Sequence, residues 1–301
     1  MNYRVTNSFS SANTSARINK QQNVLNVLQE RLSSGKRINR PSDDPGGAEI
    51  VLKLRTSQTE IEQFKRNAAA SNQKLNAADD TLSSYTNILD RLKTLVTQGL
   101  SDTTTQPARD ALATEIQSLR ERVLNTANSK YGDEYIFGGT RQNAPPYDPT
   151  SSIPAVTPTN PQYVQIEPGT NAIAVGVTAE TVFADSTSNI FTDIDAAITA
   201  LRGTGNPITD RTTLQNTVSR LKIYSDLSAI AQAKIGANVN ITDIAQDRLS
   251  GEFLSLDQRA NDIEGADFAD TAVRLTAAQN VLEATLQVAA NGRRSLFDFL
   301  G

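Results

Sequence analysis

The sequence predicts a mainly α-helical protein: an elongated helical bundle or coiled coil with paired terminal helices and a small inserted antiparallel β module. Three observations lead to this prediction. A long seam of apolar and small residues repeats with heptad spacing, weaker stripes with similar spacing occur near both ends, and seven of the eleven prolines fall between residues 141 and 189. Aromatic residues make up only 5% of the 301 residues, which argues against one large aromatic-rich core.

The strongest helical signal covers residues 50–96, where apolar or small residues recur at alternating gaps of four and three. This spacing fits a heptad frame for more than six repeats and is typical of long packed helices. Such a helix is about 70 Å long at about 1.5 Å per residue, so it needs equally long partners. The seam consists of Ile50, Leu54, Ser57, Ile61, Phe64, Ala68, Ser71, Leu75, Ala78, Leu82, Tyr85, Leu89, Leu92 and Val96.

Later segments supply these partners. After a break at residues 99–107 the same spacing returns, and it occurs again in two stretches towards the end of the chain. Asp210 is expected to cap the later helix, with Thr209 just before it. The residues that carry the spacing are Leu112, Ile116, Leu119 and Val123, then Leu214, Val218 and Leu221, then Leu249, Phe253, Leu256, Ala260 and Ile263.

Both ends of the chain are predicted to form amphipathic helices. Their stripes contain Ile18, Leu25, Leu28 and Leu32 near the start and Phe268, Ala272, Leu275, Leu282, Leu286 and Ala289 near the finish. Further valines at 24, 27, 273, 281 and 288 widen the stripes beyond what one partner helix covers. Isolated helices of this kind are marginal in water. We therefore expect the ends to pack against each other and against other copies, through Ile18, Leu25, Leu28, Leu32, Leu275, Leu282, Leu286 and Leu296. Helices that lie on a membrane surface are the alternative. They usually carry Lys and Arg on the polar face, whereas the polar faces here consist mainly of Asn, Gln, Ser and Thr.

The proline-rich segment 141–189 excludes a long helix. Alternating runs at residues 163–166 and 173–177, separated by the turn signal Pro168-Gly169, predict a small antiparallel β module. A short helix over residues 190–201, ended by Gly203, is expected after it.

The composition removes whole classes of chemistry. The sequence has no His, Cys or Trp, so it holds no imidazole or thiolate nucleophile, no zinc site built from those ligands and no disulfide. A carboxylate-based enzyme such as a glycosidase stays open, but no aromatic-lined sugar cleft is evident. No stretch approaches the roughly 20 apolar residues of a membrane span. Residues 1–20 lack the apolar core of a cleaved secretory signal.

The charge is unevenly distributed over a chain whose net charge is −4. Residues 1–40 hold seven cations and one anion, a net of +6, whereas residues 252–270 hold six anions and one cation, a net of −5. A basic arm can bind nucleic acid or a membrane surface, but this one is sparse and has few aromatic residues. We expect it instead to pair with the acidic segment, with Lys36, Arg37 and Arg40 facing Asp262, Glu264 and Asp267.

Four ordered motifs carry a resemblance to a known family. The run from Leu32 to Pro45, LSSGKRINRPSDDP, resembles the signature that follows the first helix in bacterial flagellins and their relatives. The stretches EYIFGGT at 134–140, KIGA at 234–237 and SLFDFL at 295–300 agree with it. The signature positions are Ser34, Gly35, Asn39, Pro41, Asp43, Asp44 and Pro45. The chain is on this basis similar to the flagellin family over all but its β insert.

The resemblance implies a flagellin-like fold and a structural role in the flagellum. Residues 1–45 with 260–301 would form an inner-tube coiled coil, 46–140 with 190–259 a helical bundle, and 141–189 an outer β-rich domain. The Pro-Ser-Asp-Asp-Pro form of the signature is that of family members at the junction of hook and filament. Its implied partners are hook-associated protein 1, flagellin, copies of itself in a ring, and an export chaperone before secretion without signal cleavage. No cofactor, nucleic acid or membrane partner is implied.

Several alternatives remain beside this interpretation. A minor flagellin is the nearest one, although flagellins usually end in Leu-Leu-Arg and this chain ends in Phe-Asp-Phe-Leu-Gly. Asp43 and Asp44 could be metal ligands, but their position between Pro41 and Pro45 fits a turn and a helix start better. The stretch 138–141, GGTR, lacks the pattern of a phosphate-binding loop and is expected to reverse the chain.

Overall fold

The computed structural model describes residues 3–148, 159–169 and 172–300, and the side chains of residues 12–148, 159–169 and 172–290. Its contacts divide the chain into a terminal unit, residues 1–60 with 252–301, and a central unit, residues 61–251. The elements, in order, are α1 (Tyr3–Ser34), α2 (Pro45–Gly99), α3 (Gln106–Ala127), β1 (Lys130–Tyr131), β2 (Glu134–Tyr135), β3 (Tyr163–Gln165), β4 (Ala172–Ala174), α4 (Ala179–Phe183), α5 (Ile190–Arg202), α6 (Pro207–Glu264) and α7 (Phe268–Leu300).

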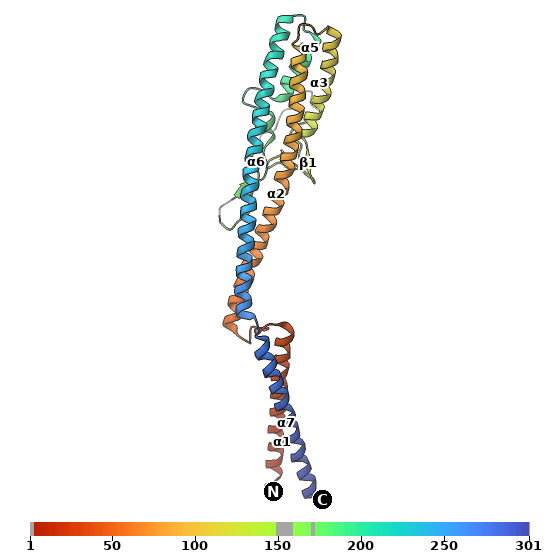
Figure 1. The fold of residues 1–301 in the computed structure, drawn as a ribbon. Helices are drawn as coiled ribbons and strands as arrows, with labels where there is room; N and C mark the ends of the chain where they lie inside the picture. Colours follow the sequence, from red (N-terminus) through yellow and green to blue (C-terminus); the bar gives the residue numbers. More distant parts are fainter. Residues whose placement is uncertain (1–2, 149–158, 170–171, 301) are drawn as a thin grey trace. The chain divides into compact units, whose positions relative to one another are not determined.

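The predicted fold class is confirmed: the chain is mainly α-helical, with paired terminal helices and small antiparallel strands inserted between the long helices (Figure 1). Within the described residues the strands form two separate pairs, β1 with β2 and β3 with β4. The division into three domains predicted above stays a prediction, and the contacts group residues 141–189 with the helices of the central unit.

The heptad seam is confirmed as the buried side of α2. Every seam residue from Ala68 to Val96 is at most 2% exposed. The seam is less covered earlier, since Ile50 is 50% exposed and Leu54, Ser57 and Phe64 are half-buried. Side-chain hydrogen bonds join α2 to the β insert at Asn67, to β2 at Lys74 and to α3 at Arg91, which agrees with the better burial in this part of the helix. The seam of α3 is buried throughout.

The start of α6 corrects one expectation. The helix begins at Pro207, and the side chain of Asn206 accepts hydrogen bonds from the backbone N–H groups of Ile208 and Thr209 at 3.2 and 3.4 Å. Asn206 is therefore the cap rather than Asp210, because Pro207 takes the first helical position, which needs no N–H donor. Asp210 lies inside the first turn and accepts hydrogen bonds from the N–H and hydroxyl groups of Thr204.

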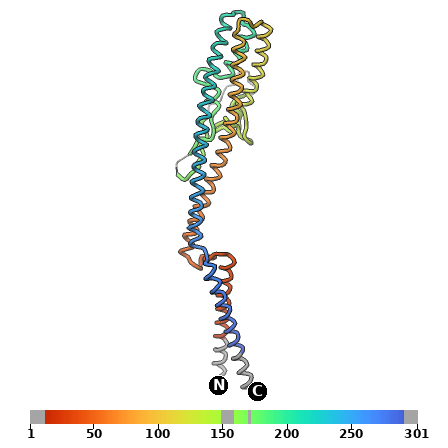
Figure 2. The backbone as a smooth tube through the Cα atoms, in the orientation of Figure 1, coloured from red at the N-terminus to blue at the C-terminus, as the bar shows by residue number. Residues whose placement is uncertain are grey.

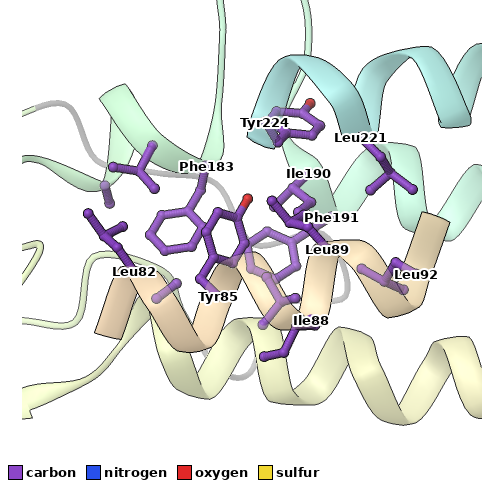
Figure 3. Close-up of a cluster of buried hydrophobic side chains, with 14 of the residues drawn as sticks. Leu82, Tyr85, Ile88, Leu89, Leu92, Phe183, Ile190, Phe191, Leu221 and Tyr224 are labelled. Atoms are coloured by element: carbon purple, nitrogen blue, oxygen red, sulfur yellow. The ribbon is translucent and has the colours of Figure 1, made fainter. Parts of the chain in front are cut away.

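The core of the central unit contains a cluster of buried aromatic and aliphatic side chains (Figure 3). Tyr85 of α2 packs edge-on against Phe183 of α4 at a centroid distance of 4.6 Å, and Phe183 also meets Phe137 at 5.2 Å. Phe191, at the start of α5, lies in the same cluster, 4.9 Å from Tyr147. Aromatic side chains of α2, α4 and α5 thus pack together with Phe137 and Tyr147.

A polar network holds α5 and the preceding turn against α6. Arg220 donates to Asp185 at 2.7 and 2.8 Å and to Asp193 at 3.0 Å, and the Tyr224 hydroxyl donates to Asp193 at 2.6 Å. The hydrogen bonds from Arg220, together with those from the backbone N–H groups of Thr187 and Ser188, lower the pKa of Asp185 well below its ordinary value of 3.8. The predicted helix over 190–201 is confirmed as α5, with Asn189 as its cap and Gly203 after its last residue.

The β insert lies on both long helices. Strands β3 and β4 pair antiparallel with Val164 opposite Ile173, as their alternating sequences predict. The Asn67 side chain of α2 donates to the carbonyl of Gln165, and the Asn238 side chain of α6 donates to the carbonyl of Ala174. Pro149, Pro154 and Pro158 lie outside the described residues. The short pair β1–β2 and helix α4 were not predicted.

Candidate assembly interface in the terminal unit

Helices α1 and α7 form an antiparallel pair within the terminal unit (Figure 2). Gln21 donates to the carbonyl of Ala278 at 3.2 Å, and Lys36 forms a backbone bridge with Gly265 at the far end of the pair. On the facing sides, Leu28 and Ala278 are only 8% and 6% exposed. The two ends of the chain therefore pack on each other, as their stripes predict.

The predicted interface residues fall into three groups. Leu28 is buried, and Ile18, Leu25, Leu32, Leu275 and Leu282 are half-buried in or beside the contact of α1 with α7. Leu286 is 47% exposed. Leu296 lies in α7, beyond the residues whose side chains are described.

The two-helix contact leaves a second apolar stripe uncovered by the described part of the chain. Val273, Val281 and Val288 of α7 are 70%, 52% and 71% exposed, and Val24 and Val27 of α1 are 41% and 39% exposed. Two helices with so little buried between them gain little stability from their own contact. The exposed stripe is thus a candidate surface for a further helix pair.

The signature residues form the link between α1 and α2. Gly35, at φ +69°, ends α1 in a left-handed conformation that favours glycine, and its carbonyl accepts from the N–H of Ala266 at 2.9 Å. Asn39 donates through its side chain to the carbonyl of Lys36 at 3.1 Å. Ser34 lies in the last position of α1, and its hydroxyl accepts from the N–H of Lys36. Hydrogen bonds therefore hold the link to the end of α1 and to the segment between α6 and α7.

The two aspartates of the signature close the turn and start α2. Asp43 accepts from the N–H groups of Asn39 and Arg40 at 3.0 and 2.9 Å, and Asp44 accepts from the N–H of Gly47 at 3.0 Å. These backbone hydrogen bonds lower the pKa of both carboxyl groups. Asp44 followed by Pro45 is a helix cap with proline in the first turn, and Pro41 lies in the turn before it. Among the described residues no cluster of three or more acidic side chains is placed to hold a metal ion.

The predicted charge pairing is present in part. Lys36 pairs with Glu264 at 3.2 Å. Arg37 donates to the Ile263 carbonyl at 3.0 Å and pairs with Asp44, rather than with a carboxylate of the acidic segment. Arg40 pairs with Glu30 of α1 at 3.2 Å, because the turn closed by Asp43 directs it back along that helix.

Two acidic residues of the prediction have other surroundings. Asp267 caps α7 by accepting from the N–H groups of Ala269 and Asp270 at 2.9 and 3.0 Å. Asp262 is exposed on α6, with no ion pair to the described part of the chain. In the structure, Lys36, Arg37 and Arg40 thus pair with Glu264, Asp44 and Glu30 and not with Asp262 or Asp267.

Arg55 and Asp257 are the residues that sequence reasoning missed. Arg55 donates to Glu264 at 2.6 Å and to Asp257 at 3.0 Å, and Gln58 also donates to Asp257. Burial would raise the pKa of Glu264, whose side chain is 7% exposed, but hydrogen bonds from Arg55 and Lys36 outweigh burial and lower it. We call Lys36, Arg55, Asp257 and Glu264 the link cluster. Arg55 and Glu264 are 209 residues apart, so no local spacing could have paired them.

The stretch 138–141 reverses the chain in the central unit, as expected. The N–H of Arg141 donates to the carbonyl of Gly138 at 2.9 Å, and Gly139 has φ +55°. A Cβ at Gly139 would collide with the carbonyl of Asn160, so glycine is required there. Within the described ranges, no helix is both long and apolar enough to cross a bilayer.

Comparison with known proteins agrees with this architecture. Residues 5–142 match the bacterial flagellin N-terminal helical region. Flagellar hook-associated protein 3 of Salmonella typhimurium is 28% identical over 189 residues, which cover 58% of this chain and 59% of that protein. Hook-associated protein 3 of Escherichia coli is 25% identical over 285 residues, which cover 85% of this chain and 86% of that protein. The match thus spans less than two thirds of the Salmonella relative.

A solved structure shows the same fold. A flagellar hook-associated protein from Vibrio parahaemolyticus superposes with a TM-score of 0.69 at 21% identity, over 74% of this chain and the whole of that one. The part of this chain that the superposition covers therefore has a known fold.

Proposed function

We propose that this chain is a member of the flagellin family and a structural subunit at the hook-filament junction of the bacterial flagellum. It would act as hook-associated protein 3, joining hook-associated protein 1 to the first flagellin subunits and so supporting motility. The observation that carries the proposal is the α1–α7 pair, which has one apolar stripe in mutual contact and a second one exposed.

The exposed stripe supplies a mechanism for assembly. Three valines of α7 are more than half exposed, and their contact with water is unfavourable. Burial of these side chains by neighbouring subunits would be favourable. Burial of the stripe against copies of the same chain would complete a core that two helices cannot form alone, so subunit addition stabilises the terminal unit. Because all copies in a ring or tube meet head to tail, the contact is heterologous.

The proposal includes the route to the site. We infer an extracellular location at the flagellum, reached by export without a cleaved signal peptide, with a dedicated chaperone holding the subunit beforehand. The packing of α1 on α7 supports this, since few of the described side chains of these two helices are buried and such a pair unfolds for export at low cost. No enzymatic activity, cofactor or small-molecule substrate belongs to this function.

A minor flagellin is the second candidate, favoured by the match of residues 5–142 to the flagellin N-terminal region. The two functions differ in the consequence of losing the protein. A strain without the junction protein carries bare hooks and releases flagellin into the medium, whereas loss of a minor filament subunit leaves filaments in place.

The deletion strain, complemented with variants of the full chain, tests the proposal. Wild-type chain restores filaments. Val281→Asp places a charge on the exposed stripe of α7 and is expected to leave bare hooks, while Asn280→Asp adds the same charge one position away at an exposed polar site and restores filaments. Normal filaments in the uncomplemented deletion would overturn the junction function, and equal behaviour of the two variants would overturn the role of the stripe.

A further inference from the structure

A row of exposed isoleucines lies on α6, on the side opposite its buried seam. The row consists of Ile208, Ile223, Ile230, Ile241 and Ile244, which are 80%, 38%, 52%, 48% and 68% exposed. At about 3.6 residues per turn, all five lie within about 60° of one another around the helix and extend along about 54 Å of it. We call this row the isoleucine face. It belongs to the central unit and plays no part in the terminal interface.

The isoleucine face has the spacing of a helix-packing seam. Ile223, Ile230, Ala237 and Ile244 recur every seven residues, which is the repeat of a coiled-coil contact. Ala237 belongs to the KIGA stretch, and it is exposed, as is the Ile230 side chain one heptad before it. Thr212, Ser219 and Asp226 lie on the same side of the helix and interrupt the row. A soluble monomer nevertheless rarely exposes so many large apolar side chains on one side of a helix, so the face is suited to another helix of similar length.

Two opposite charges lie beside the centre of the face. Asp226 precedes Ile230 by four residues and Lys234 follows it by four. Both side chains are exposed, and neither pairs with an opposite charge in the part of the chain that the structure describes. A parallel copy of α6 would place like charges at the same level. An antiparallel copy centred on Ile230 places Asp226 of each chain at the level of Lys234 of the other chain, so two opposite-charge pairs form.

We propose that the isoleucine face docks a second copy of this chain, antiparallel, with the Ile230 side chains of the two copies in contact at the centre. In this register Ile223 lies at the level of the partner's Ala237, so a large side chain meets a small one on each side of the centre. The charge pattern selects the direction and the register, and the isoleucines supply the apolar area.

This contact differs from the assembly contact of the proposed function and does not rest on it. The antiparallel pair is isologous, because each copy presents the same surface to the other, and it therefore closes on itself as a dimer. Subunits in a ring or tube share one orientation. The dimer is accordingly a form of the free subunit, and its existence can be tested on purified full-length chain.

Cysteine cross-linking tests the register, since the chain has no cysteine of its own. Full-length Ile230→Cys is expected to form a disulfide-linked dimer under mild oxidation. Ile223→Cys alone should not, because its two copies lie far apart in the antiparallel register, but a mixture of Ile223→Cys and Ala237→Cys chains should cross-link. Cross-linking of Ile223→Cys with itself and not of Ile230→Cys would overturn the antiparallel arrangement.

Sedimentation equilibrium of the cysteine-free chain tests the dimer itself. Ile230→Asp is expected to weaken self-association by about a hundredfold or more, because both copies lose the central contact and gain like charges. Asn240→Asp adds the same charge off the face and leaves the dimer intact. Asp226→Lys weakens it, and the exchange Asp226→Lys with Lys234→Asp restores it. Circular dichroism confirms that each variant is folded. A wild-type chain that stays monomeric up to the highest soluble concentration would overturn the proposal.

Discussion

The Glu264→Gln substitution is expected to loosen the link between the terminal helices and the long helices α2 and α6. Glu264 is the member of the link cluster with the least exposed side chain, at 7%, and it accepts from Arg55 at 2.6 Å and pairs with Lys36 at 3.2 Å. Its backbone carbonyl also accepts from the N–H of Arg37. Gln keeps the shape and removes the charge, so Arg55 and Lys36 lose their shared partner.

The magnitude follows from the burial of the three groups. Removing one partner of a fully buried pair costs about 3–5 kcal/mol. Arg55 and Lys36 are 39% and 45% exposed and regain water, and Arg55 keeps Asp257, so about 1–3 kcal/mol is the appropriate range. That free energy corresponds to a roughly 5- to 150-fold increase in local opening.

Amide hydrogen exchange in the link measures this opening. The N–H of Arg37, bonded to the Glu264 carbonyl, and the N–H of Ala266, bonded to the Gly35 carbonyl, should exchange faster by that factor. Asp262→Asn makes the same charge change two residues away, at an exposed position, and should leave both rates within about twofold. Equal exchange in the two variants would refute the link cluster as a stabilising contact.

Lowering the pH should loosen the wild-type link, as the Glu264→Gln substitution does. The folded-state pKa of Glu264 lies below its ordinary value of 4.5. Its contribution to stability is therefore complete above about pH 4.5 and is lost as the pH falls through the lower folded-state pKa. The protection factor of the Arg37 amide, which corrects for the intrinsic pH dependence of exchange, should therefore fall with acid in the wild-type chain and fall less in Glu264→Gln.

Three further substitutions test the packing and capping. Leu89→Ala is expected to lower the free energy of unfolding in urea by about 2–5 kcal/mol, whereas Lys93→Ala on the exposed side of α2 should change it by less than about 0.5 kcal/mol. Asp44→Ala removes the cap of α2 and should cost about 1 kcal/mol, read from faster amide exchange at the first turn. Tyr85→Phe should be neutral or stabilising in urea, because its buried hydroxyl has no hydrogen-bond partner among the described residues, while Tyr224→Phe should cost about 1–3 kcal/mol through the bonds its hydroxyl makes.

The long helices were predictable because their burial repeats in the sequence. From Ala68 to Val96 the heptad positions of α2 are the buried positions, since the same helical side faces the core over many turns. Alternation likewise placed β3 and β4, and the turn residues placed the link. Each of these signals depends on residues that are close together in the sequence, so it can be recognised without knowing the rest of the fold.

Elements that depend on distant partners were not predictable in the same way. Helix α4 has only five residues and no full period, and β1 and β2 have two residues each. Arg55 lies beside the seam on α2 and looks like an ordinary solvated charge until Glu264 and Asp257 are brought to it. The acidic segment 252–270 showed where negative charge accumulates, but the cap at the start of α7 and the orientation of Arg40 decide which carboxylates pair.

The central claim is that the outer stripe of α7 is exposed in the free subunit and covered in the flagellum. Thiol accessibility tests it most directly, with single cysteines introduced at Val281 and, as a control, at Tyr163 of the β insert, which is 63% exposed. In the purified subunit both cysteines should react with a maleimide. In isolated flagella the cysteine at position 281 should be protected, while the one at position 163 still reacts. Equal labelling at position 281 in the free and the assembled protein would contradict the account.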